Sequence, residues 1–442
     1  MKQFTVFLIF ALSLTSPLAA DGDSGSGETI ITDEEELFGE TVLEDMTEEA
    51  EQTDIETLLS RETVDIGGKI AIATSTAADF TDFWGAGTDL DLEADVYLDA
   101  RPDEDFRVFL KAGLSYPFLS DDDREFSDIF TIKEIFSDFQ IGDSVFFRAG
   151  KHTVTWGVGY FFSPADIINL EMIDPEDPEA DRTGPVSLKT QVPFGSHNGY
   201  LYLLLDEWAE SSAPAIAPKL EFVIGGAEVG IGGYYHYEAP PAGMLTFSFP
   251  YRDFSFFGEL MGRYGSDKTF VEESDDLLNY PLGYAPVLYE DTFFFSGTAG
   301  VIYSHMDDDN RFNFTLAGQY YYNGEGYADP SVITDNTDAL GYLAAAGELT
   351  VNDLLYPGQH YGAALVSWAG MLDSDFSTSL FWMGSFSDMS GRITASISYR
   401  VNDYFSLSLG LLQTYGAEGL EFTPDGRATK LTFEASLGTG KF

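Results

Sequence analysis

Apolar and polar residues alternate with a period of two along most of the chain from Val64 onward. Ile393, Ala395 and Ile397, for example, alternate with Arg392 and Thr394. Runs of this kind occupy residues 90–99, 107–114, 312–321, 392–401 and 405–412. Successive side chains of a β-strand point to opposite faces, so each run predicts a strand with one apolar and one polar face. Each run has about the length that a tilted strand needs to cross an outer membrane.

The connections between the predicted strands alternate in length, which a soluble β-sandwich does not require. The short connections fall near residues 102–103, 142–143, 195–196, 225–226, 252–253, 307–308, 373–374 and 402–403. The long connections fall at about residues 74–88, 116–127, 155–184, 207–215, 264–290, 323–358 and 416–427, with two shorter members near Pro240 and Ser390. The runs are also longer than the usual strand of about 5 to 6 residues. Both features favour a barrel over a sandwich.

Tight periplasmic turns and long extracellular loops are typical of outer-membrane barrels. We therefore predict an all-β fold for residues 63–442: a transmembrane antiparallel β-barrel of about eighteen strands, with sixteen as the alternative. A barrel this wide leaves a lumen that wall side chains cannot fill, so we expect one or two loops to fold into it. The candidates are residues 323–358, with a helical pattern over 335–355, and residues 155–184, with a helical pattern over 164–172.

The segment from Arg148 to Asn169 carries a distinctive motif. Its characteristic residues are Gly150, Lys151, Trp156, Gly157, Pro164, Asp166 and Asn169. The segment resembles a signature of porin-like bacterial outer-membrane barrel families, one of them grouped as a domain of unknown function. There, Gly-Lys-Gln and Trp-Gly close a strand, and Pro-x-Asp-x-x-Asn-Pro opens a loop. The chain departs from it at His152, where Gln is usual, and at Leu170, where the second Pro is usual. The resemblance implies the location and the architecture, and no particular substrate.

Two interpretations of this loop remain open: a pore constriction, or a brace for the barrel wall. Trp156 and Phe161-Phe162 are expected to anchor a strand end in an interfacial aromatic girdle, and Gly157 allows the chain to fold back. The candidate constriction residues are Trp156, Gly157, Pro164, Asp166, Asn169, Asp174, Asp181 and Arg182.

Charged residues occupy the polar face of several predicted strands. The candidate lumen charges are Asp91, Glu93, Asp95, Arg107, Lys111, Arg148, Arg392 and Arg400. Fixed charges set ion preference in pores, and an acidic lumen would give a weak preference for cations. The alternative is that these residues form salt bridges along the wall and have no influence on permeation.

The composition adds a strong acidic bias and no cysteine. The formal net charge is -52, so no basic face exists to meet nucleic-acid phosphates. Mean hydropathy is -0.07. A value near zero is expected for barrel strands, because only every second side chain faces the lipid. Residues 1–20 read as a signal peptide, with Lys2 before an apolar stretch and small residues before Asp21. Residues 21–62 hold sixteen acidic residues against Arg61, which predicts a disordered periplasmic segment.

The remaining chemistry is sparse. The acidic runs at residues 121–123 and 307–309 lack Ca²⁺-loop spacing and read as solvated turns. The five His residues have no metal-ligand or nucleophile spacing. Phe442 fits an assembly signal for the barrel-assembly machinery. We therefore expect no enzyme, cofactor or metal, and a cell-outer-membrane channel in contact with lipid that passes small solutes by diffusion. The rival functions are a surface structural or adhesive protein and an uptake channel for hydrophobic compounds; the oligomeric state stays open.

Overall fold

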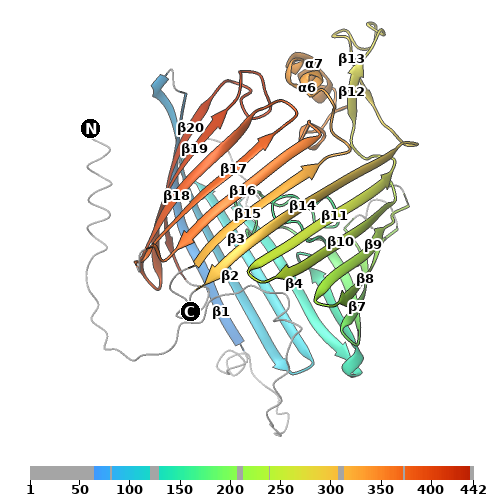
Figure 1. The fold of residues 1–442 in the computed structure, drawn as a ribbon, viewed down its shortest axis with the longest axis vertical. Helices are drawn as coiled ribbons and strands as arrows, with labels where there is room; N and C mark the ends of the chain where they lie inside the picture. Colours follow the sequence, from blue (N-terminus) through green and yellow to red (C-terminus); the bar gives the residue numbers. More distant parts are fainter. Residues whose placement is uncertain are drawn as a thin grey trace. The chain divides into compact units, whose positions relative to one another are not determined.

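The structure is a computed structural model that describes residues 64–79, 82–119, 129–206, 213–237, 239–306, 313–371 and 374–438. Within these residues, eighteen strands pair with their neighbours into one antiparallel sheet, which closes where β1 pairs with β20 (Figure 1). The prediction of an all-β transmembrane barrel of about eighteen strands is confirmed. The predicted signal segment, the acidic segment 21–62, the acidic runs 121–123 and 307–309, and Phe442 lie outside the described residues.

The barrel strands follow one another around the wall in chain order. The first nine are β1 Val64–Asp79, β2 Asp82–Asp103, β3 Phe106–Pro117, β4 Phe130–Ile141, β5 Val145–Lys151, β6 Val186–Phe194, β7 His197–Leu204, β8 Ala215–Ile224 and β9 Ala227–Tyr234. The other nine are β10 Ala242–Tyr251, β11 Phe254–Tyr264, β14 Phe293–Met306, β15 Asn313–Tyr322, β16 His360–Ala369, β17 Phe376–Ser385, β18 Gly391–Asn402, β19 Phe405–Tyr415 and β20 Ala428–Leu437. A short 3-10 turn, Gly142–Ser144, joins β4 to β5.

The outer face of the wall is an exposed apolar surface. On β1, Ile66, Ile70 and Ile72 are all more than 40% exposed, and on β19 Leu409 and Leu411 are similarly exposed. Comparable rows continue on β10, β14, β18 and β20. A protein in water rarely exposes a contiguous apolar surface of this extent, and a closed barrel leaves no unpaired strand edge for the bilayer core. The apolar face is therefore the lipid-facing surface.

The two ends of the barrel differ as the connection lengths predict. At the short-turn end, β6 joins β7, β8 joins β9 and β10 joins β11 through two-residue turns. β1 begins and β20 ends at this same end, since Val64 pairs with Ala100 and Leu437 with Phe405. At the opposite, long-loop end the largest connections are residues 152–185, 265–292 and 323–359.

The long connection predicted at residues 74–88 is wrong. β1 and β2 continue as a paired hairpin up to Asp79 opposite Asp82. Cross-strand bonds explain the extension: the Thr74 hydroxyl donates to the Asp89 carbonyl at 2.9 Å, and the Thr76 hydroxyl lies 3.4 Å from that of Thr88. β-branched Thr side chains pack well in strands and can pair across them.

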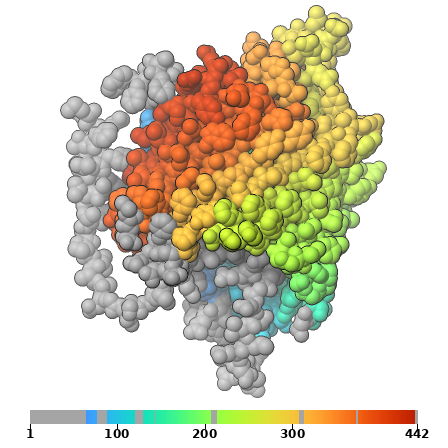
Figure 2. All heavy atoms as spheres, in the orientation of Figure 1, coloured from blue at the N-terminus to red at the C-terminus, as the bar shows by residue number. Residues whose placement is uncertain are grey.

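Two long loops build a small structure above the long-loop end (Figures 1 and 2). Residues 265–292 form the hairpin β12 Phe270–Glu273 and β13 Tyr284–Val287, and residues 323–359 contain α6 Ser331–Thr334, α7 Thr337–Ala345 and the 3-10 turn Asn352–Leu354. Val271, Ile333, Leu340 and Leu343 pack together between the two loops. The helical pattern predicted over 335–355 is thus broken: α7 ends before Gly347, whose φ of +77° is the left-handed conformation that glycine adopts freely. No helix among the described residues is long and apolar enough to cross a membrane.

Candidate functional site: a loop inside the barrel

The connection between β5 and β6, residues 152–185, which we call the inner loop, lies inside the barrel. It bonds to inward-facing side chains from strands around the wall. These are Lys111 on β3, Lys133 on β4, Lys219 on β8, Glu259 on β11, Gln319 on β15 and Arg392 on β18. Because β3 and β11 lie nearly opposite each other around the closed eighteen-strand wall, a segment that reaches both crosses the lumen.

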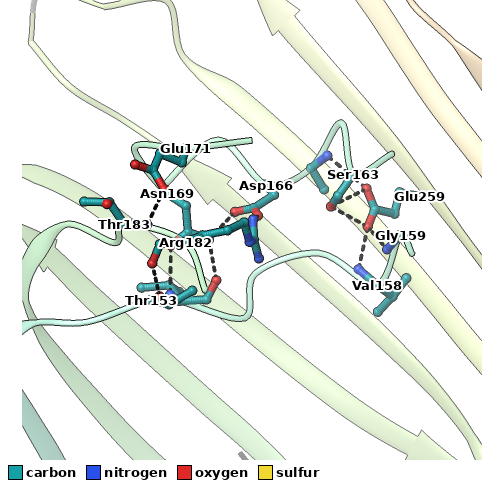
Figure 3. Close-up of polar contacts among 12 residues, drawn as sticks. Thr153, Val158, Gly159, Ser163, Asp166, Asn169, Glu171, Arg182, Thr183 and Glu259 are labelled. Atoms are coloured by element: carbon teal, nitrogen blue, oxygen red, sulfur yellow. Dashed lines mark hydrogen bonds and ion pairs between the residues drawn. The ribbon is translucent and has the colours of Figure 1, made fainter. Parts of the chain in front are cut away.

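Glu259 accepts the hydrogen bonds donated by one bend of the inner loop, residues 158–165. Its side chain is fully buried, and its carboxylate accepts the backbone N–H of Val158, of Gly159 at 2.5 Å and of Ala165 at 3.0 Å. The Ser163 hydroxyl donates to the same carboxylate at 2.9 Å (Figure 3). These four hydrogen bonds to one side chain fix the bend of the loop to β11.

Gly157 is required by this close approach. A Cβ added there would lie 2.0 Å from the Ser163 hydroxyl and 2.4 Å from the Glu259 carboxylate. The Trp-Gly pair of the sequence motif therefore serves the docking of the loop onto β11, because only glycine leaves room for the carboxylate.

The apolar anchors of the loop point inward, so the prediction of an interfacial girdle is wrong for them. Trp156 is 1% exposed and packs against Tyr202, Ala217 and Met244, on the inner face of β7, β8 and β10. The Lys219 ammonium donates to the Trp156 carbonyl at 2.9 Å. Inside a wide lumen this aromatic surface finds more complete burial than it would at the membrane boundary.

Phe161 and Phe162 anchor the loop to a second part of the wall, formed by β15, β16 and β17. Phe161 is 1% exposed and Phe162 5%, and both pack with Tyr361 and Phe381. The Gln319 side chain satisfies their backbone: its carbonyl oxygen accepts the Phe161 N–H at 2.6 Å and its amide donates to the Phe162 carbonyl at 2.5 Å. Aromatic burial and backbone pairing together hold this point of the loop.

The motif residues Asp166, Asn169 and Arg182 fasten the two ends of the loop together. The Asn169 side chain pairs with both backbone groups of Val154, at 2.8 and 2.6 Å. It also donates to Asp166 at 2.7 Å, and Arg182 forms an ion pair with the other Asp166 oxygen (Figure 3). Burial raises the pKa of Asp166, while the Arg182 guanidinium opposes that rise.

The helix predicted over residues 164–172 does not form. This stretch consists of turns and bends. Its polar groups are used elsewhere: Ser163 and the N–H of Ala165 bind Glu259, and Leu170 donates its N–H to the Thr183 carbonyl at 3.1 Å. Long-range bonds have replaced the local bonds that a helix needs.

The acidic residues of the loop face cations on the wall. Asp181 lies 2.6 Å from the Lys111 ammonium and 3.7 Å from that of Lys133. Asp174 lies 3.8 Å from Arg392, which is also 3.6 Å from Glu176. Lys133 was not among the predicted lumen charges. The pairing of β3 with β4 shifts register between Lys111 and Ala112, so the simple alternation along β4 does not predict which way Lys133 points.

The other predicted lumen charges are mostly paired along the wall. Arg107 binds Asp99 through two bonds of 2.8 and 3.0 Å, and Arg148 binds Asp138 through two of 2.7 and 3.1 Å. Asp95 lies 2.6 Å from Lys133. Asp91 and Glu93 lie on the same face of β2 by the alternation of the strand. Arg400 differs: it is 66% exposed beside Asp375 near the short-turn end.

His152, where the sequence motif usually has Gln, is buried and uncharged. Burial, with a contribution from the nearby Arg148 charge, lowers the pKa of His152 to about 3. Its ring packs edge-on to Phe136, with 5.9 Å between ring centres. A histidine neutral throughout the physiological range is a packing residue here and not a pH sensor.

Taken together, these contacts place an acidic loop across the interior of a closed, lipid-facing barrel, an architecture found in bacterial outer membranes. The protein is an outer-membrane β-barrel. No known protein family and no curated protein matches the sequence. In the described parts of the chain, no three His, Cys, Asp or Glu side chains gather to hold a metal ion.

The chain is distantly similar to several solved barrel structures. OccD3 (OpdP) of Pseudomonas aeruginosa is 8% identical, with a TM-score of 0.47 over 86% of this chain and 92% of that chain. A triple mutant of Rhodopseudomonas blastica porin is 7% identical, with a TM-score of 0.42 over 85% of this chain and 100% of that chain. A loop-deletion mutant of OmpT, an outer membrane protein of Vibrio cholerae, is 8% identical, with a TM-score of 0.39 over 86% of this chain and 100% of that chain.

Proposed function

We propose that this protein is a porin-like channel, rather than an enzyme, for the passive diffusion of small solutes, and that the inner loop narrows its lumen. The observation that carries the proposal is the path of this loop, which reaches side chains on β3, β11, β15 and β18. A lumen of eighteen strands needs such a restriction to discriminate between solutes.

A weak preference for cations follows from the charge of the loop. Residues 152–185 contain seven acidic residues and one basic residue, Arg182. Burial, together with Asp174 and other neighbouring acids, raises the pKa of Asp177, the effect expected where carboxylates crowd. The lysines opposite Asp181 reduce the preference, because they neutralise part of the acidic charge.

Single-channel recording in planar bilayers tests this function. The intact protein should conduct small ions, and deletion of residues 164–181 should raise the conductance, because it removes the segment that crosses the lumen. The triple replacement of Asp166, Asp174 and Asp181 by Asn should lower cation preference chiefly in dilute salt, where the Debye length is about 30 Å at 0.01 M. Unchanged conductance after the deletion would assign the loop a bracing role and make residues 323–358 the better candidate for the restriction. A protein that does not conduct at all would favour a surface structural or adhesive role.

An uptake channel for hydrophobic compounds is the second candidate. It is favoured by the apolar lining that Phe162, Met172 and Met261 give to a cavity beside the inner loop. Comparing permeation of a charged ion with accumulation of a neutral apolar dye in liposomes separates the two: a hydrophobic channel should take up the dye and conduct ions poorly.

A further inference from the structure

A cavity of about 180 Å³ lies between the inner loop and the long-loop ends of β11, β14 and β15. The loop contributes apolar walls, among them Phe161, Phe162 and Ile173, and the barrel contributes Met261 and Tyr321. An apolar cavity of about 150 Å³ is enough to bind benzene. The space beside the inner loop therefore accommodates one aromatic ring or a short alkyl chain, together with a small polar group.

One cationic side chain, Arg263 on β11, lines this cavity. Its side chain is 17% exposed, and its Nε is buried without a hydrogen-bond partner in the described structure. Its ion pairs are loose, since Nη1 lies 3.5 Å from Asp267 and 3.8 Å from Glu325. A guanidinium offers two parallel N–H groups that match a carboxylate. A buried donor without an acceptor is unfavourable, and an incoming carboxylate would satisfy it.

Arg263 has a second cation, Lys268, close to the acidic residues that surround it. Lys268 donates to the Glu325 backbone carbonyl at 3.1 Å, so two cations stand beside the carboxylates of Asp267 and Glu325. Asp166, which also lines the cavity, is neutralised by its ion pair with Arg182. Arg263 and Lys268 therefore offset Asp267 and Glu325, while Asp353 and Glu421 add negative charge on the Lys268 side.

We propose that this cavity binds a small monocarboxylate with an apolar body, aromatic or aliphatic, on its way through the channel. The Arg263 guanidinium would receive the carboxylate while Phe162, Ile173 and Met261 cover the apolar part. The proposal rests on the proposed channel function and adds a substrate class to it.

Current recordings with benzoate and hexanoate test the proposal on the full-length protein in planar bilayers. Both acids should block the KCl current transiently and saturably, whereas benzyl alcohol and hexanol, which lack the charge, should block weakly. A block by one acid alone identifies the preferred body as a ring or a chain. Equal block by acid and alcohol would overturn the role of Arg263 and leave a merely apolar cavity.

Variants locate the site. Arg263→Met should raise the half-blocking concentration roughly tenfold or more, the loss expected for a charge-assisted hydrogen bond. The matched control Arg400→Met, near the short-turn end, should leave it unchanged. Ile173→Trp fills the cavity and should abolish the block while Arg263 is intact. If Arg263→Met does not fold, this variant still tests whether the acids bind in the cavity. A channel that conducts KCl but is not blocked by either acid refutes the carboxylate site and leaves the channel function standing; absence of KCl conductance refutes the channel function itself.

Discussion

The carboxylate of Glu259 on β11 and the hydroxyl of Ser163 in the inner loop lie 2.9 Å apart across 96 residues of sequence. The same carboxylate accepts three backbone N–H groups of the loop. A single wall residue thus satisfies four donors of a segment that has no regular secondary structure of its own. The position of the loop depends on this residue more than on any local structural preference.

Replacing Glu259 by Ala should therefore release the loop. Each buried N–H left without an acceptor costs about 1–3 kcal/mol, and the docked position loses stability relative to an undocked one. We expect a larger and noisier single-channel conductance and a lower unfolding temperature in detergent. Glu273→Ala, at an exposed position of the hairpin strand β12, is the control and should behave as the parent. An unchanged conductance in Glu259→Ala would contradict the proposed role.

Truncating the aromatic anchor tests packing separately from hydrogen bonding. Phe162→Ala should destabilise the protein by about 3–5 kcal/mol, the range for removing a buried aromatic side chain. Thermal unfolding followed by circular dichroism, with protease digestion within residues 152–185, measures the effect. Phe386→Ala, in an exposed turn, should change stability by less than about 0.5 kcal/mol. Equal effects of the two replacements would show that the anchor contributes little.

The lysines opposite Asp181 should weaken any cation preference of the channel. Lys111→Met combined with Lys133→Met removes both partners of Asp181, so the reversal potential should shift toward cation selectivity. The shift should be largest in dilute salt, because screening is weakest there. Asp181→Asn should move it the opposite way, and Arg252→Met, in an exposed short turn, should leave it unchanged. A salt-independent shift would point to altered loop structure instead of altered charge.

Stability should fall as pH rises toward 8 because of Glu421 in the β19–β20 connection. Burial raises the pKa of Glu421 to about 8, although the Tyr361 hydroxyl donates to its carboxylate at 2.9 Å. The folded state therefore keeps a proton that the unfolded chain loses near its ordinary value of about 4.3. The contribution of Glu421 to the free energy of unfolding therefore decreases as the pH rises from about 4.3 to about 8, and it is constant at higher pH.

Glu421→Gln mimics the protonated carboxyl and should remove that part of the pH dependence. The variant should be more stable than the parent at pH 9, by a few kcal/mol at most, and similar to it at pH 4. Melting curves at the two values measure the difference. Glu418→Gln, which sits in the same connection and is exposed, is the matched control. A variant that is equally stabilised at both values would refute this protonation.

Topology can be tested with inserted tags. Tags at Asp275, in the β12–β13 hairpin, and at Asp335, beside α6, lie at the long-loop end, and we expect them to be labelled on intact cells. A tag at Asn402, where β18 meets the short-turn end, should be labelled only after the outer membrane is opened. The opposite labelling would invert the predicted orientation.

Most of the wall was predictable from the sequence because strand alternation reports the environment of every second side chain. The runs over 392–401 and 405–412 coincide with β18 and β19. Short and long connections alternate as predicted in the described parts of the chain, apart from residues 74–88. The path of the inner loop was not predictable, because its partners are far away in sequence. Glu259 did carry a signal: it is the only charged residue between Phe254 and Gly262, at an inward position of the strand. Lys133 gave none, since a register shift decides which way it points.

The distance along the chain between the inner loop and its partners has a consequence for assembly. The Phe161 N–H meets Gln319 across 158 residues, and the Glu176 carboxylate meets the Thr394 hydroxyl across 218. Contacts of such sequence separation form late, because the intervening chain must first be ordered. The inner loop can therefore take its final place only after β15 and β18 have joined the wall, so a nascent barrel passes through a stage that is wide open before it becomes restricted.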